Sequence, residues 1–188
     1  MDLSKTEWLR AARVALLRGG VASVRVEPLA RELGVTKGSF YWHFADRAEL
    51  LEALIQEWEA EADLLIGALG APRSDGLRGL LDQLARNVIA SERGEVPSDA
   101  AVFGWAAVSP EIAERVKAAE EERISLLGEL IGDRTRGELA YMAYLGFILR
   151  RRHSEDPAKA FGQIADFFVS LAEQSASVSS NASAKAPH

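Results

Sequence analysis

The apolar positions of this chain recur at helical spacing nearly from end to end. They predict a first helix over residues 5–18, which ends at Gly19-Gly20. A short second helix is predicted to begin near Pro28, because proline suits the first turn of a helix. The expected buried stripe of the first helix consists of Trp8, Leu9, Ala12, Ala15 and Leu16.

Two further helices are predicted to follow at once. The third covers GVTKGSFYWHF, residues 34–44. The fourth starts at Asp46, where Asp46 and Glu49 have the spacing of a capping pair, and it runs to about Gly67. The segment GALGAPRSDG, residues 67–76, is rich in turn-forming residues and is the best candidate for a domain boundary.

Beyond this boundary the pattern predicts helices at about 75–92, 110–131 and 135–152. A last helix is expected to open at Pro157 and end near Glu173, and residues 94–109 are expected to be looser. The tail 175–188 is small and polar and is predicted to be disordered, because it cannot bury enough apolar surface to order itself. No segment shows convincing strand alternation, so an all-α fold is expected.

Residues 28–44 match the pattern of a helix-turn-helix. Ala30 is small enough for a close helix crossing, and Gly34 suits the tight turn. On a helical wheel Phe40 and Phe44 fall on one side, whereas Tyr41 and Trp42 fall on the opposite arc. The phenylalanines are therefore expected to face a core and the other two rings a DNA major groove. A core helix with Tyr41 and Trp42 packed under a neighbour is the alternative at this stage.

Two C-terminal segments carry more apolar surface than one helix face can hide. ELAYMAYLGFIL, residues 138–149, is apolar on nearly all sides, and Phe161, Ile164, Phe167, Phe168 and Leu171 make a broad stripe on the last helix. We expect these helices to be buried against a second subunit. A well-buried core helix within one chain is the alternative.

Composition excludes several kinds of chemistry. The chain has no cysteine and three scattered histidines, so neither a disulfide nor a metal site is expected. Its longest apolar run, residues 140–149, is about half of what a bilayer span requires, and a signal-peptide layout is missing, which predicts a cytoplasmic protein without membrane contact. The net charge is −6, but residues 1–50 carry +2 and the remainder −8. This asymmetry weakly favours a nucleic-acid-binding head.

No constellation supports catalysis. Ser39 and His43 are one helical turn apart, but no third residue nearby would orient the histidine. We therefore expect no enzyme activity, no catalytic residues, no bound metal and no cofactor.

The stretch LARELGVTKGSFYWHFADRAELLEAL, residues 29–54, resembles the TetR/AcrR family of bacterial transcriptional regulators, with a likeness that extends over about residues 5–60. This resemblance implies a three-helix DNA-binding domain and a larger C-terminal helical domain that binds a ligand and forms a homodimer. Glu27 departs from the family pattern, which commonly has a basic residue nearby. By match to the family motif the DNA-binding positions are Arg25, Thr36, Lys37, Gly38, Ser39, Tyr41, Trp42, His43 and Arg47.

The prediction is therefore an all-α, homodimeric regulator: residues 1–48 form a helix-turn-helix DNA-binding domain, residues 49–174 a helical ligand-binding and dimerisation domain, and residues 175–188 a disordered tail. Its expected partner is a double-stranded DNA operator. It is expected to act as a repressor that a small hydrophobic effector, neutral or cationic, releases from this operator. A C-terminal domain that senses a protein partner and, less favoured, an enzyme on a helical scaffold are the alternatives. Candidate effector-binding residues, each also suited to an ordinary core, are Trp58, Phe103, Trp105, Tyr141 and Met142.

Overall fold

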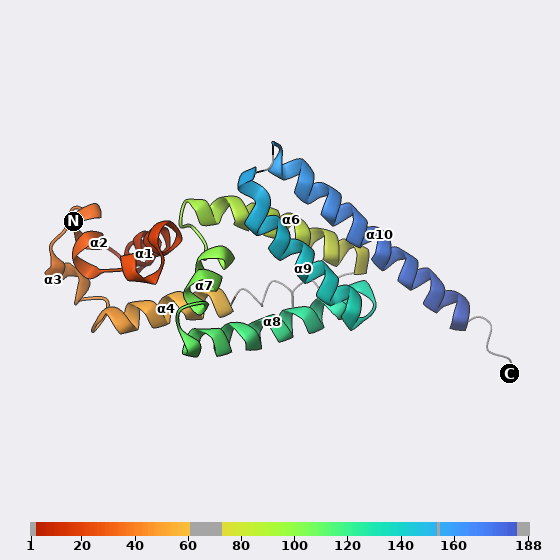
Figure 1. The fold of residues 1–188 in the computed structure, drawn as a ribbon, viewed down its shortest axis with the longest axis horizontal. Helices are drawn as coiled ribbons and strands as arrows, with labels where there is room; N and C mark the ends of the chain where they lie inside the picture. The colour runs from red at the N-terminus through yellow and green to blue at the C-terminus, as the bar shows by residue number, and fades with distance from the viewer. Residues whose placement is uncertain (1–2, 61–72, 154, 184–188) are drawn as a thin grey trace. The chain divides into compact units, whose positions relative to one another are not determined.

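The structure is a computed structural model that describes residues 3–60, 73–153 and 155–183. These residues form helices and connecting turns, with no strand among them, as the sequence predicts. The chain divides into two compact units: Met1–Glu61 with Asn87–Lys117, and Ala62–Arg86 with Ala118–His188. Figure 1 shows the helices of both units along the chain.

The first helix, α1 (Lys5–Gly19), has the expected bounds to within a residue. Ser4 caps it: its hydroxyl accepts a hydrogen bond from the Glu7 backbone N–H at 3.4 Å, and the Glu7 carboxylate accepts one from the Ser4 backbone N–H at 2.7 Å. The helix ends at Gly20, whose φ of 69° lies in the left-handed region that favours glycine. Trp8, Leu9, Ala12 and Leu16 are buried as expected.

The next elements are a 3-10 turn η1 (Val21–Ser23), α2 (Val26–Glu32) and α3 (Lys37–Phe40). Helix α2 begins before Pro28, which therefore lies inside its first turn. Gly34 adopts a φ of 70°, and this turn lets the Val35 N–H reach the Ala30 carbonyl at 3.0 Å. Regular α-helix at α3 is shorter than predicted, but the His43 and Phe44 N–H groups still bond the Phe40 carbonyl.

Helix α4 (Arg47–Glu59) starts where the sequence predicted, with the Asp46 carboxylate accepting from the Glu49 N–H at 2.9 Å. The reciprocal contact differs from the expected capping pair, because the Glu49 carboxylate accepts from the Ala45 N–H instead. The predicted extension of this helix to Gly67, and most of the predicted boundary at 67–76, lie outside the described residues.

Helix α6 (Arg73–Glu92) and α8 (Pro110–Ile131) match the prediction, but the segment between them does not. Residues 94–109 were expected to be loose, whereas Asp99–Ala106 form α7. This short helix is apolar on most sides and so lacks an amphipathic stripe. Tertiary contacts hold it instead: Val102 and Trp105 are buried, and the Trp58 indole N–H donates to the Asp99 carboxylate at 2.6 Å.

In the first unit, α1, α2, α3 and α4 pack together, with α7 against α1 and α4 (Figure 1). A buried arginine joins three of its segments. Arg13 of α1 donates to the Glu57 carboxylate of α4 at 2.6 Å and to the Gly94 carbonyl at 2.7 Å. Gly94 itself has a φ of 69° and lies against Arg10 and Val14, so this turn requires a glycine.

In the second unit, α9 (Arg134–Arg150), the turn η2 (Arg151–His153) and α10 (Pro157–Ser183) follow α8. Helices α9 and α10 lie side by side (Figure 1). The expected end of the last helix near Glu173 is wrong, because α10 continues to Ser183 and includes part of the tail predicted to be disordered. Alanine and serine permit helix here, and no glycine or proline interrupts residues 174–183.

Candidate nucleic-acid interface

The aromatic side chains of residues 40–44 separate into a buried and an exposed pair, as the wheel predicts. Phe40 and Phe44 are 0% and 1% exposed, whereas Tyr41 and Trp42 are 54% and 88% exposed. An indole with almost its whole surface in solvent has no part in the packing of this unit. The alternative in which Tyr41 and Trp42 belong to a core is therefore wrong.

Phe40 is the centre of a ring cluster that orients this surface. Its centroid lies 5.3 Å from Trp8 of α1 and 5.4 Å from Phe44. It also meets the Tyr41 ring edge to face, at 5.3 Å and 81°. Because edge-to-face pairs are favourable beyond simple burial, the half-exposed Tyr41 ring has a preferred orientation before any partner arrives.

Gly38 makes the same surface accessible at the backbone. It is exposed, and a β-carbon built on it would meet only the Thr36 hydroxyl, at an ordinary 3.6 Å. The fold therefore does not require glycine here. A glycine at this point leaves the backbone of α3 open to close approach by a partner.

Lys37 is exposed, but its ammonium group is paired with a carboxylate. Its ammonium lies 3.0 Å from the Glu27 carboxylate of α2. The hydrogen bond from Lys37 lowers the pKa of Glu27, and the same contact raises the pKa of Lys37. The sequence singled out Lys37 but not this pairing, because the two residues meet only through the turn at Gly34.

Arg47 has a structural contact that the sequence did not predict. Its guanidinium donates to the Val24 carbonyl at 2.6 Å and to the Val21 carbonyl at 2.7 Å. These bonds tie the start of α4 to the η1 turn. Arg47 thus donates to the carbonyl of the first residue of this turn and to that of the residue that follows the turn, in addition to any contact that its exposed part makes with a phosphate.

The remaining predicted DNA-binding residues lie around these groups. Arg25 precedes α2 and Thr36 precedes α3, each in extended backbone and each exposed. Ser39 and His43 are half-buried. Arg31, which the sequence did not single out, is exposed at the end of α2 and acts electrostatically on Glu27. The sequence feature that could have identified Arg31 is its position as a cation on the polar side of a short helix.

The candidate effector residues are divided between the two units. Trp58, Phe103 and Trp105 belong to the first unit, where the Trp58 and Phe103 rings meet edge to face at 6.2 Å. Tyr141 and Met142 belong to the second. Trp58, Trp105 and Tyr141 are buried, whereas Met142 is 57% exposed.

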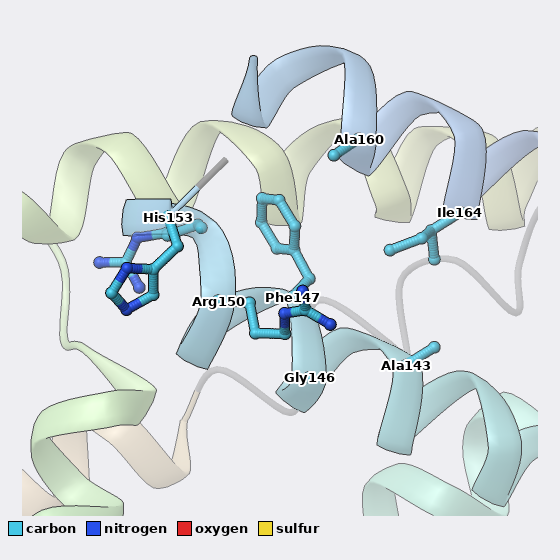
Figure 2. A pocket seen from close by; sticks show the side chains of 8 residues that line it. Ala143, Gly146, Phe147, Arg150, His153, Ala160 and Ile164 are labelled. Atoms are coloured by element: carbon cyan, nitrogen blue, oxygen red, sulfur yellow. The ribbon is translucent and has the colours of Figure 1, made fainter. Parts of the chain in front are cut away.

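A groove of about 460 Å³ lies between α9, η2 and α10, and none of those five residues lines it. Figure 2 shows Phe147 between the two helices, with Arg150 and His153 at the η2 end. The groove is lined by Ala143, Gly146, Phe147, Arg150, Arg151, His153, Ala160 and Ile164. The flanking face carries exposed apolar side chains at Leu139, Met142, Leu149 and Phe167.

Along the ranges that the structure describes, no helix is long and apolar enough to cross a membrane. The same ranges hold no group of three acidic or histidine side chains arranged to bind a metal ion.

Helix α3 follows α2 after the turn at Gly34, and its exposed face carries aromatic and cationic side chains. This arrangement is that of a helix-turn-helix protein. The model of the family "Bacterial regulatory proteins, tetR family" matches residues 9–54, which include α2, α3 and this surface. Over residues 9–54 the chain is therefore similar to the N-terminal domain of this family.

Sequence relatives match the same part of the chain. The HTH-type transcriptional regulator TtgR of Pseudomonas putida is 35% identical over 65 residues, which cover 35% of this chain and 31% of TtgR. The chain thus matches about a third of the length of this curated relative.

Solved structures match more of the fold. A TetR-family transcriptional regulator from Streptomyces coelicolor has a TM-score of 0.66 at 16% identity, covering 93% of this chain and 95% of that one. NalD, the secondary repressor of the MexAB-OprM multidrug efflux pump in Pseudomonas aeruginosa, has a TM-score of 0.56 at 22% identity. The match covers 87% of this chain and 92% of NalD. At these identities the likeness establishes the fold.

Proposed function

We propose that the chain is a DNA-binding transcriptional regulator, a repressor, that reads its operator through the exposed face of α3. The observation that carries this proposal is the placement of Trp42 and Tyr41 in solvent directly beside the buried Phe40. Exposed rings on a helix that can enter the major groove suit contact with thymine methyl groups, while Lys37 and Arg25 suit phosphate. Repression is supported by the likeness to NalD, the secondary repressor of an efflux pump, and the domain match supports the DNA contact.

The proposed assembly is a homodimer in which residues 1–48 bind DNA and residues 49–174 hold the subunits together. Exposed Leu139, Met142 and Leu149 follow one face of α9, and Phe167 is exposed on α10. On α10, Phe167 shares its side with Ala160, Ile164 and Leu171 at spacings of three and four. We assign the groove between these helices to the same face, where side chains of a second copy would fill it.

Phe168 does not belong to that face. The sequence includes it in the broad stripe expected to be buried against a second subunit, but it is 5% exposed within the chain and packs edge to face with Phe167 at 5.3 Å. On this helix the exposed ring of the pair is Phe167.

A small hydrophobic effector, neutral or cationic, completes the proposal. Such a compound must prefer the DNA-incompetent arrangement, because equal affinity for both states shifts no equilibrium. It should therefore raise the melting temperature and lower the operator affinity together. A library in which only carboxylates or phosphates do both would contradict the effector class. A library in which nothing does either would favour a protein partner as the signal.

Selection of duplexes from a randomised DNA library tests the DNA-binding function. Wild-type protein should enrich a sequence with two half-sites related by a two-fold axis, because a homodimer presents two α3 helices. Trp42→Ala should lose that enrichment while it melts at the wild-type temperature. Wild-type protein that enriches no sequence and shows no salt-dependent binding to any duplex would overturn the proposal.

A further inference from the structure

A carboxylate lies within the surface proposed to face DNA. Glu27 of α2 is ten positions before Lys37 of α3, and the turn at Gly34 brings its Oε1 to 3.0 Å from the Lys37 Nζ. Both side chains are well exposed, at 68% and 51%. The pair therefore connects the two helices of the helix-turn-helix across their solvent side.

Other cations surround the same carboxylate. Arg31 and Arg25 both act on Glu27 electrostatically, in addition to Lys37, and together they keep its pKa below the ordinary value. Glu27 is thus ionised at neutral pH. It places a negative charge where this surface otherwise presents cations to the phosphate backbone.

We propose that Glu27 is a specificity-determining residue, which lowers the affinity of this protein for DNA of any sequence by holding Lys37 and repelling phosphate. This inference rests on the proposed DNA-binding function. Phosphate contacts dominate non-specific affinity and carry no sequence information. A carboxylate that neutralises one cation removes part of this sequence-independent attraction, and base contacts by Tyr41 and Trp42 then make a larger share of operator binding.

Glu27→Gln tests the proposal, because it keeps the shape of the side chain and removes its charge. Binding to a random-sequence duplex is measured against salt concentration, next to a duplex selected by the wild-type protein. We expect the variant to bind the random duplex several-fold more tightly. Its plot of log affinity against log salt should be steeper by about one unit, the value for one added phosphate contact. The ratio of selected to random affinity should fall.

Glu32→Gln provides a matched control on the same helix. Glu32 is also exposed and also paired, with Arg18 at 4.0 Å, and its substitution changes the net charge by the same amount. Five residues of helix place it about 140° around α2 from Glu27. It should leave both the random-duplex affinity and the salt dependence unchanged.

A second variant identifies the cation that is released. In the Glu27→Gln background, Lys37→Gln should return the salt dependence to the wild-type slope, whereas in the wild-type background the same change should alter the slope on random DNA much less. Thermal melting of each variant confirms that it is folded before binding is compared.

Three outcomes would overturn the inference. Glu27→Gln could leave the random-duplex affinity and slope unchanged, or Glu27→Gln and Glu32→Gln could shift them equally, which is a net-charge effect. Glu27→Gln could also change recognition at one base pair alone, which would make the carboxylate a base contact. All three require wild-type protein that binds DNA, so they are distinct from a failure of the proposed function.

Discussion

Gly137 of α9 lies against Gly128 of α8 so closely that a β-carbon on Gly137 would come within 2.5 Å of the Gly128 backbone nitrogen. It would also lie 2.6 Å from the Ile124 carbonyl oxygen. The two helix backbones thus meet at a point where only hydrogen atoms fit. Backbone cannot move aside as the end of a flexible side chain can, so the crossing depends on a glycine at position 137.

Gly137→Ala should therefore destabilise the protein by about 1–3 kcal/mol, the usual range for overpacking, although alanine is the better helix former. Gly79→Ala on α6 is the control, because a β-carbon there meets nothing within 4 Å. It should be neutral or raise the melting temperature, since glycine costs about 1 kcal/mol relative to alanine inside a helix. Equal effects of the two substitutions in denaturant unfolding would contradict the close crossing.

Tyr41→Ala and Trp42→Ala should each weaken operator binding by about 1–3 kcal/mol, the range for a lost base contact. Both should leave the melting temperature nearly unchanged, because both rings are exposed. Phe40→Ala should instead lower the stability by about 3–5 kcal/mol, because it removes a fully buried ring. Aromatic variants at 41 and 42 that bind normally and melt early would contradict this assignment.

Two substitutions at Arg47 should affect the stability of the protein and the salt dependence of DNA binding differently. Arg47→Lys keeps the positive charge but loses the planar guanidinium, whose two separate nitrogens donate to the Val24 and Val21 carbonyls. It should lower the melting temperature while the salt dependence of DNA binding is retained. Arg47→Ala should lower the melting temperature and also flatten the slope by about one unit, if the side chain contacts a phosphate. Melting of both variants at the wild-type temperature would show that the two bonds to carbonyl groups contribute little to stability.

The Arg115 guanidinium of α8 should make stability depend on pH through α4. It donates to the Glu52 carboxylate at 2.7 Å and to both oxygens of Glu59, at 2.7 and 2.6 Å. The hydrogen bond from Arg115 lowers the pKa of Glu52 below its ordinary 4.5. A carboxyl whose pKa is lower in the folded state stabilises the protein above its unfolded pKa, and this contribution disappears as the pH falls through the folded value.

Glu52→Gln should accordingly melt below the wild type at pH 7, and the gap should close as the pH falls below 4.5. Glu114→Gln, on the exposed side of α8, should match the wild type across the whole range. A gap for Glu52→Gln that stays constant with pH would contradict an ionic origin.

Phe167→Asp should dissociate the proposed dimer without unfolding the chain. The ring is 58% exposed in one chain, so a carboxylate there meets solvent in the monomer but an apolar surface in the dimer. Sedimentation should change from a dimer to a species of 20.4 kDa. Phe168→Leu, which alters the buried neighbouring ring, should remain dimeric. A wild-type protein that sediments as a monomer would remove both the dimer and the two-half-site model.

Local patterns determined much of this protein by themselves. The Asp46 cap, the glycine turns at Gly20 and Gly34 and the periodicity of α8 require only neighbours within a few residues, so the sequence predicts them directly. The division between buried Phe40 and exposed Trp42 also follows from helical geometry.

Tertiary structure decided whatever depends on residues far apart in sequence. Helix α7 has no amphipathic stripe and depends on burial of Val102 and on the Trp58–Asp99 hydrogen bond. The sequence predicts an exposed lysine at position 37, but only the α2–α3 turn sets it against Glu27. Phe167 and Phe168 are equivalent in composition, yet packing exposes one ring and buries the other. Contacts of this kind have no local period, because they arise where two elements meet in space.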